Sequence, residues 1–287
     1  YFVDYGNIYD WNCDLPGANG DRTLLNVLDR WILARLTEVV LGSRKALDKY
    51  DIPEYVSLIK EFLVNDFSTW YIRRSRDRVG AQSEDKKDRD AFYETTKNVL
   101  VTISTLLAPI APFISEEIYR NLTGEESVHL TNWIKEDEKL IDAKLTEEMN
   151  SARHLVEVVH ALRKQAEVKV RIPIREMSYE GPVEFSKEIL EVIKTEINAY
   201  ELFYKGKLNE FKVKAKTSDD NLDLQFGLAR DIVRKIQEER KVLQTSPDEK
   251  VKITIPFWPK EHEAYIKKRA MVSIIKEGEK FSVTKNE

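Results

Sequence analysis

The sequence predicts a mainly α-helical fold, in which an antiparallel helical bundle is followed by a smaller α+β domain. In the first half, apolar residues recur every three or four positions over long segments, which is typical of helices that pack against one another. The second half alternates such segments with short runs in which every second residue is apolar, as in strands packed on helices. We therefore expect a helical domain at residues 1–145 and an α+β domain at residues 146–287.

The spacing of apolar residues predicts four helical segments in the first half, at about 22–49, about 54–79, about 92–107 and about 113–122. Asp21 is a suitable N-cap for the first segment. The tetrapeptide "YDIP" separates the first two segments, because the residue before a proline avoids helical geometry. The prolines of "APIAP" end the third segment, and Gly124 ends the fourth. Such short links are typical of helices in an antiparallel bundle.

The second half begins with a helix predicted at about 143–166. It leads into "VKVRIPI" (168–174), whose alternating side chains predict a strand. No internal repeat is evident. The remaining elements are expected to be helices near 184–197 and 222–242, strands near 200–205, 209–216 and 251–257, and a final short helix with two strands.

The composition limits the class of protein. Of the 287 residues, 42% are hydrophobic and 33% are charged, which is ordinary for a soluble globular protein. The net charge of -4 argues against indiscriminate nucleic-acid binding, although a local basic surface can still attract an anionic partner. Cys13 is the single cysteine, which excludes internal disulfides and is compatible with a reducing cytosol. We expect a cytoplasmic protein without a membrane partner, because no apolar run reaches about 18 residues.

The most concentrated positive charge lies in "WYIRRSRDR" (70–78), which has four arginines within six positions. On a regular helix with a step of about 100° per residue, Arg73 and Arg74 continue the apolar face. Arg76 and Arg78 then lie on its flanks. Trp70 itself is expected in the core.

Two interpretations of these arginines remain open. They can pair with carboxylates such as Asp77 or Glu116 and so close the end of the bundle, where exposed pairs contribute little stability. Alternatively, the guanidinium groups can hold phosphates through paired hydrogen bonds. The arginines outnumber the one neighbouring aspartate, which leaves more positive charge than structural pairing requires.

A second basic segment, "RKQAEVKVRIPIR" (163–175), offers a similar choice. On a strand, Lys169, Arg171 and Arg175 would share one face, which is either an ordinary solvated surface or a track for a nucleic-acid backbone. The mixed charges of "LARDIVRKIQEERK" (228–241) favour a structural role.

Catalytic signals are scarce. The four histidines form no metal-ligand pattern, and there is no glycine-rich phosphate loop, HExxH motif or nucleophile elbow. We therefore expect neither a catalytic residue nor a metal site nor a cofactor in this chain. Because Tyr1 is not an initiator methionine, we expect the chain to be part of a longer protein.

Six ordered segments resemble the isoleucyl-tRNA synthetase family, a group of class I synthetases, from just after the catalytic core onward. The opening "YFVDYGNIYDW" resembles the link out of that core. "DRWIL" and "LAPIAPF" are shared with valyl and leucyl relatives, whereas "WYIRRSRDR" indicates the isoleucyl type. The six segments are "DRWILARL" (29–36), "FLVNDFSTWYIRRSRDR" (62–78), "LLAPIAPFISEEIYRNL" (106–122), "SVHLTNW" (127–133), "RKQAEVKVRIPI" (163–174) and "ARDIVRKIQEERK" (229–241).

The resemblance implies an anticodon-binding helical bundle with an appended α+β domain. The two nucleotide-binding signatures of the catalytic core and the zinc-binding cysteine cluster of many bacterial relatives are absent from these 287 residues. The full enzyme would use ATP and magnesium to attach isoleucine to tRNA(Ile). The expected partners of this chain are therefore tRNA(Ile) and the catalytic domain of the same protein.

The resemblance also suggests which residues contact tRNA, because RNA loops are bound by aromatic rings, arginine planes and phosphate contacts. Glu116 and Glu117 are expected to pair with arginines. One rival interpretation is the same region of a valyl- or leucyl-tRNA synthetase, and another is a non-catalytic helical scaffold. The expected tRNA-binding residues are Tyr71, Arg73, Arg74, Arg76, Arg78, Lys169 and Arg171.

Overall fold

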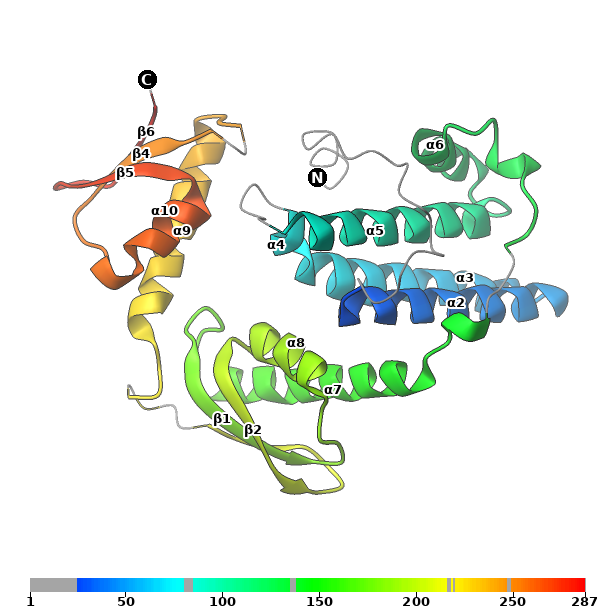
Figure 1. Ribbon diagram of the computed structural model, residues 1–287, viewed down its shortest axis with the longest axis horizontal. Coiled ribbons are helices and arrows are strands. Elements are labelled where there is room, and N and C mark those ends of the chain that lie inside the picture. Colours follow the sequence, from blue (N-terminus) through cyan, green and yellow to red (C-terminus); the bar gives the residue numbers. More distant parts are fainter. Residues whose placement is uncertain are drawn as a thin grey trace. The chain divides into compact units, whose positions relative to one another are not determined.

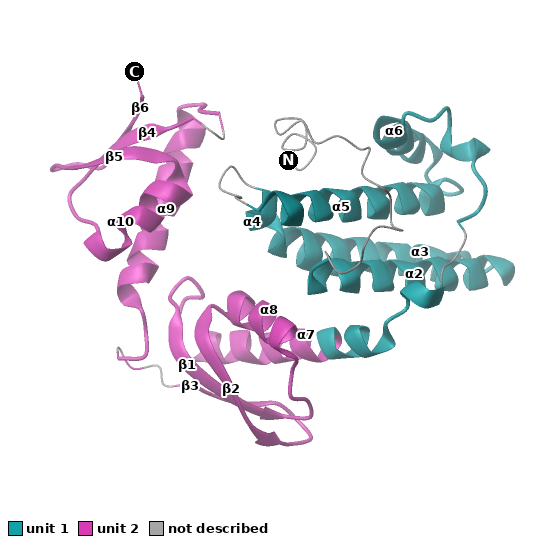
Figure 2. Cartoon of the chain, viewed as in Figure 1, with its two compact units in different colours: residues 1–149 teal, residues 150–287 magenta. Residues whose placement is uncertain are grey.

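The computed structural model describes residues 25–79, 85–134, 138–215, 218, 220–246 and 249–286. The chain divides into two units, residues 1–149 and 150–287, and the division falls inside one long helix, α7 (Ala143–Gln165) (Figure 2). The boundary expected after residue 145 lies in the first turn of that helix. The opening segment and the expected N-cap Asp21 lie outside the described residues.

The described part of the first unit is helical, as predicted. Figure 1 shows the first long helices side by side, and α2, α3 and α5 contact one another. The helical elements are α2 (Val27–Asp48), α3 (Ile52–Glu61), the π-helix η2 (Phe62–Ile72), α4 (Arg76–Val79), α5 (Lys86–Leu107), α6 (Pro112–Thr123), and the short 3₁₀ turns η3 (Val128–Leu130) and η4 (Glu138–Leu140).

Local chemistry fixes the helix ends. The side chain of Asn26 accepts hydrogen bonds from the backbone N–H groups of Leu28 and Asp29, so Asn26 is the N-cap of α2. The prolines separate α5 from α6, as predicted. Gly124 ends α6 in the left-handed conformation (φ 71°), which glycine adopts without steric cost.

The helix expected at 54–79 is not regular. Its central part, η2, is a π-helix with i→i+5 hydrogen bonds, and the helix is interrupted at Ser75 before α4 begins. The wider turn shifts the helical phase of every following residue. Our prediction that Arg73 continues the buried face, with Arg78 on its flank, was therefore wrong, whereas Arg74 is half-buried and Arg76 is exposed. Arg73 is exposed, whereas Arg78 points into the bundle.

The second unit combines helices with two three-stranded sheets, which confirms the predicted mainly α fold with an α+β part. Its strand orders are β2-β1-β3 and β5-β4-β6. After α7, the elements are β1 (Ile174–Gly181), α8 (Lys187–Ile197), β2 (Ala199–Lys207), β3 (Lys212–Ala215), α9 (Leu224–Val242), β4 (Val251–Ile255), the 3₁₀ turn η5 (Lys260–His262), α10 (Glu263–Ala270), β5 (Val272–Glu277) and β6 (Ser282–Lys285).

The second unit contains the same arrangement twice, contrary to our expectation of no repeat. Helix, strand, helix, strand, strand follow one another from α7 to β3 and again from α9 to β6, if the turn η5 is set aside. In each copy the first strand pairs in parallel with the second and antiparallel with the third. A buried arginine occupies the same place in both first helices, since Ala152 precedes Arg163 by the same interval that separates Ala229 from Arg240.

The predicted strand at 168–174 was also wrong, because β1 begins only at Ile174. The preceding residues form turns around the guanidinium of Arg163, which donates hydrogen bonds to the carbonyl oxygens of Lys169 (3.4 Å) and Ile172 (3.0 Å). The same group also donates to the carbonyl oxygens of Ile197 (2.7 Å) and Asn198 (2.9 Å). These hydrogen bonds fold the segment around the buried side chain, and the strand begins at Ile174, whose backbone N–H donates to the same Asn198 carbonyl at 3.1 Å.

Candidate nucleic-acid interface

Arg78, the last arginine of the basic stretch, is a structural residue. Its Nη1 and Nη2 donate to the two carboxylate oxygens of Asp29, at 2.7 Å each, and its Nε donates to Asp88 at 3.0 Å. Only 9% of the Arg78 side chain is exposed, and that of Asp29 is fully buried. Burial alone would lower the pKa of Arg78, but the hydrogen bonds and charge of Asp29 raise it overall. The bidentate pair therefore ties α4 to the start of α2.

Tyr71 belongs to the same buried cluster. Its hydroxyl donates to Oδ1 of Asp29 at 2.7 Å, and its ring stacks between Phe67 and Phe92 with centroids 5.9 and 5.7 Å away. Burial raises the pKa of Tyr71 well above its usual value, and the charge of Asp29 adds to this. Tyr71 is fully buried, so its ring cannot stack on an RNA base. We therefore withdraw Tyr71 and Arg78 from the expected RNA-binding set. Trp70 is buried, as predicted.

The other three arginines of the stretch remain at the surface. Arg73 and Arg76 are exposed and Arg74 is half-buried. The Nε of Arg73 donates to the carbonyl oxygen of Thr69 at 2.9 Å, which fixes the start of that side chain along the helix. Arg76 is exposed on the short helix α4, which the ion pairs of Arg78 tie to α2 and α5. Arg73 and Arg76 are the guanidinium groups most accessible to a phosphate, because the Nε of Arg74 is buried.

The main partners of Glu116 lie in the turn after α6, and the charge of Arg120 contributes less, so the expected pairing with an arginine is a minor part of its surroundings. Its Oε2 accepts hydrogen bonds from the backbone N–H of Val128 at 2.9 Å and from the hydroxyl of Ser127 at 3.0 Å. The backbone hydrogen bond from Val128 lowers the pKa of Glu116, and the bond from Ser127 adds to the effect. Glu117 instead accepts from Asn121 on its own helix. The two glutamates therefore hold α6 and the turn that follows it.

In the second unit, Lys169 and Arg171 lie on the turns around Arg163 and not on a strand. The side chain of Lys169 is exposed, whereas Nη2 of Arg171 forms an ion pair with Asp231 at 2.8 Å. Burial lowers the pKa of Arg163 to about 10, with a further contribution from Arg230, so its guanidinium is still charged at neutral pH. Of these residues, Lys169 is the one whose charge is most accessible to a partner.

The structure also shows surface residues that sequence reasoning missed. Phe203 on β2 is 43% exposed, and Lys205 and Lys214 lie near it on the same open face of the sheet. The alternating lysines of "KGK" and "KVK" were the signal that could have indicated a basic sheet. Among the described residues, no group of three or more histidine, cysteine, aspartate or glutamate side chains could hold a metal ion. In the described part of the chain, none of the helices has both the length and the apolar character needed to span a membrane.

Comparison with known proteins identifies the family. Residues 29–178 match the family described as the anticodon-binding domain of tRNA ligase. The chain is 35% identical over 199 residues to an isoleucine–tRNA ligase of Pyrococcus abyssi, covering 67% of this chain and 19% of that protein. It is 33% identical over 212 residues to that of Thermus thermophilus, covering 69% of this chain and 20% of the relative.

A third relative covers more of the chain. Isoleucine–tRNA ligase 2 of Bacillus anthracis is 32% identical over 278 residues, which is 88% of this chain and 26% of that protein. The chain thus spans about a quarter or less of the curated relatives it matches. The resemblance expected from the six segments is confirmed: the chain belongs to the family of tRNA-ligase anticodon-binding domains, in the isoleucine–tRNA ligase group.

Proposed function

We propose that this chain is the tRNA-binding region of a cytoplasmic isoleucine–tRNA ligase, which as a whole attaches isoleucine to tRNA(Ile) with ATP and magnesium. Residues 1–145 would recognise the anticodon stem-loop, and residues 146–287 would form the appended C-terminal domain. The catalytic domain of the same protein would receive the acceptor end of the tRNA. The observation that carries the proposal is the family match over residues 29–178, which include the exposed arginines of the basic stretch.

The proposed phosphate contacts are Arg73, Arg74, Arg76 and Lys169, with Arg171 as a weaker contributor because of its pair with Asp231. Guanidinium groups can hold a phosphate through two parallel hydrogen bonds, which fixes the orientation of the bound RNA. Phosphate contacts set register and affinity, whereas reading of anticodon bases requires contacts to base edges. These arginines would therefore orient the stem-loop without selecting its sequence.

Binding of tRNA by the isolated chain tests the proposal. Filter binding with tRNA(Ile), tRNA(Val) and tRNA(Leu) over a salt series should give the highest affinity for tRNA(Ile), with an affinity that falls as salt rises. Preference for the valine or leucine tRNA would favour the corresponding rival synthetase. Equal and negligible affinity for all three at low salt would contradict RNA binding by this chain and favour a helical scaffold.

A further inference from the structure

The two copies of the repeated arrangement in the second unit have separate apolar cores. The core of the second copy consists of buried residues between Ala229 and Val272, and among the described residues it includes none from the first copy. Apolar packing of this kind holds each copy together without fixing one copy against the other. The angle between the copies therefore depends on the contacts made where the second copy begins.

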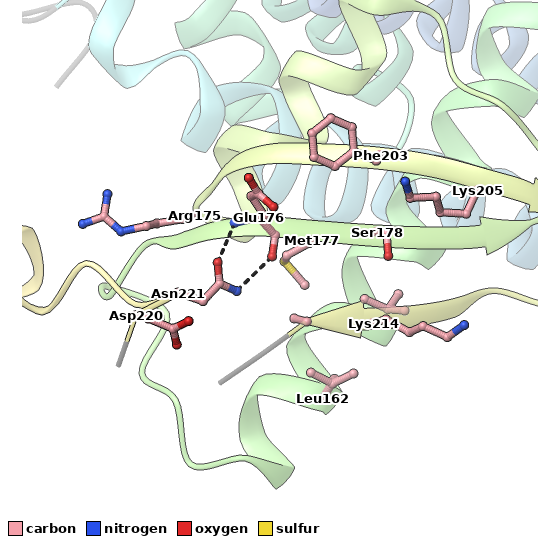
Figure 3. A pocket seen from close by; sticks show the side chains of 12 residues that line it. Leu162, Arg175, Glu176, Met177, Ser178, Phe203, Lys205, Lys214, Asp220 and Asn221 are labelled. Atoms are coloured by element: carbon pink, nitrogen blue, oxygen red, sulfur yellow. Dashed lines mark hydrogen bonds between the residues drawn. The ribbon is translucent and has the colours of Figure 1, made fainter. Parts of the chain in front are cut away.

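Residues 221–223, just before α9, are attached to the sheet of the first copy. The side-chain amide of Asn221 exchanges two hydrogen bonds with the backbone of Glu176 on β1, at 2.9 and 3.0 Å (Figure 3). The backbone N–H of Asp223 donates to the carbonyl oxygen of Pro173 at 3.0 Å. The start of α9 is therefore fixed to the first copy through its backbone.

The carboxylate of Asp223 meets groups from both copies. Its Oδ1 accepts a hydrogen bond from the backbone N–H of Phe226 at 2.9 Å, which caps α9. Its Oδ2 accepts a hydrogen bond from the hydroxyl of Tyr200, on β2 of the first copy, at 2.8 Å. The Nε2 of His262, on the turn η5 of the second copy, lies 4.0 Å from Oδ1. One carboxylate thus binds the first copy and lies beside a basic side chain of the second.

This carboxylate is charged and largely shielded from water, since 11% of the Asp223 side chain is exposed. Burial alone would raise the pKa of Asp223, but the hydrogen bonds from Phe226 and Tyr200 lower it overall. The nearby Arg175 and His262 act in the same direction. Burial raises the pKa of Tyr200 to about 12, and its hydrogen bond to Asp223 adds to this. A protonated donor therefore faces a charged acceptor, which makes a stronger hydrogen bond than two neutral groups do.

The ring of Phe226 holds the start of α9 against the rest of the second copy. Its centroid lies 4.9 Å from that of the His262 ring, in an edge-to-face arrangement. It lies 4.6 Å from the ring of Tyr265 on α10. The residue that the cap fixes is therefore packed against both η5 and α10.

A glycine allows α9 to approach the first copy closely. A Cβ atom at Gly227 would lie 3.0 Å from the side chain of Ile172, which is tighter than ordinary van der Waals contact. One turn further along α9, Asp231 forms its ion pair with Arg171 at 2.8 Å. The first two turns of α9 thus contact the segment that precedes β1.

The first copy begins in a similar way. Thr146 lies six residues before Ala152, as Asp223 lies six residues before Ala229. The hydroxyl of Thr146 donates to Glu38 on α2 at 3.2 Å. In each copy, a polar side chain near the start of the first helix is bound to the part of the chain that precedes it. The attachment at Asp223 therefore recurs with the repeated arrangement.

We infer that Asp223 is the centre of a rigid joint, formed with Tyr200, Phe226 and His262, that fixes the angle between the two copies of the second unit. The elements from α7 to β3 and those from α9 to β6 then move as one body. This inference goes beyond the proposed function and does not depend on RNA binding. It excludes a flexible tether between the two copies.

Double electron–electron resonance tests the joint. The single cysteine is removed by Cys13→Ser, and spin labels are attached at exposed positions on α8 and β5 through Lys187→Cys and Lys276→Cys. With Asp223 intact, the chain should give one narrow distribution of distances between the labels. Asp223→Ser keeps a side chain that can cap α9 but is too short to reach Tyr200, so the narrow distribution should be lost.

Tyr200→Phe is the second variant, because it removes only the hydroxyl that binds Asp223. It should broaden the distribution less than Asp223→Ser does, and it decides the question if Asp223→Ser does not fold. Asp85→Ser, which replaces the capping aspartate of α5 in the first unit, is the matched control and should leave the distribution unchanged.

Three results would overturn the joint. A broad distribution in the labelled chain with Asp223 intact would show that the two copies are joined by a flexible tether. An unchanged narrow distribution in Tyr200→Phe, and in Asp223→Ser where it folds, would show that the angle does not depend on these contacts. Equal broadening in Asp85→Ser would show that loss of any helix cap has the same effect.

Discussion

The two basic stretches of the chain, residues 73–78 and 163–171, each place one arginine in the interior, but the surroundings of the two arginines differ. Arg78 meets the carboxylates of Asp29 and Asp88, whereas Arg163 donates only to backbone carbonyls. Carboxylates raise the pKa of Arg78, while burial without an opposite charge lowers the pKa of Arg163 to about 10. A run of positive charge in a sequence can therefore contain buried anchors as well as binding residues.

Because only Arg78 neutralises a buried carboxylate, we expect its replacement to cause the largest loss of folding stability. Replacing it by methionine leaves the buried charge of Asp29 without its main partner, so Arg78→Met should lower the free energy of unfolding of the first unit by about 3–5 kcal/mol. Urea unfolding followed by hydrogen exchange of α2 and α4 measures this loss. Arg76→Met, in the same stretch, is the control and should change stability by less than about 0.5 kcal/mol. Equal losses in both variants would contradict the division between buried and exposed arginines.

A smaller loss is expected for Arg163→Met. Its acceptors are neutral carbonyls, and a buried carbonyl that loses its donor lowers the free energy of unfolding by about 1–3 kcal/mol. Water can replace the lost donor at the carbonyls on the exposed turns. We expect a net loss of about 2 kcal/mol, with faster amide exchange in residues 168–172. Arg234→Met, at an exposed position on α9, is the control. A loss greater than that of Arg78→Met would show that carbonyl binding is the stronger of the two arrangements.

The pH dependence of stability tests the contribution of Tyr71, which donates a hydrogen bond to Asp29. The raised pKa of Tyr71 keeps its hydroxyl protonated in the folded chain, whereas an unfolded tyrosine loses its proton near pH 10. Stability is therefore present below about pH 10 and falls as pH rises further, because the folded state then binds more protons than the unfolded state. Tyr71→Phe should lower the free energy of unfolding by about 1 kcal/mol at neutral pH. It should also make the fall of stability above about pH 10 less steep than in the unmodified chain.

Tyr50→Phe is the matched control for this measurement, since Tyr50 is 90% exposed. Its stability curve between pH 9 and pH 12 (a window about the unfolded tyrosine pKa) should follow that of the unmodified chain. If Tyr71→Phe has the same alkaline slope as Tyr50→Phe, the hydroxyl of Tyr71 does not contribute through Asp29.

Much of the fold could be predicted because its signals are local. The prolines between α5 and α6 and the glycine at the end of α6 mark boundaries whatever the rest of the chain does. The π-helix and the turns before β1 could not be predicted in this way. They depend on interior partners that are distant in sequence, such as the carboxylate of Asp29 for Arg78 and the carbonyl of Ile197 for Arg163.

The candidate site shows the same limit. The type of residue was foreseen, because arginines next to an aromatic helix are the groups that bind RNA. The exposure of Arg73 and the burial of Arg78 were not predicted, because the π-helix changes the phase assumed from a regular helix. The flanking position predicted for Arg76 agrees with its exposure. The repeat in the second unit could not be predicted from the sequence, because it is preserved in strand pairing and in the position of one buried arginine, while most other side chains differ.

The most direct test of the account is the salt dependence of tRNA(Ile) binding by Arg76→Gln, with Arg120→Gln as the control on another exposed helix. We expect Arg76→Gln to weaken binding several-fold and to reduce the slope of log affinity against log salt by about 1, with an unchanged melting temperature. Arg120→Gln should leave both quantities unchanged. An unchanged slope for Arg76→Gln, or a lower melting temperature with the slope preserved, would contradict the assignment of the exposed arginines to tRNA.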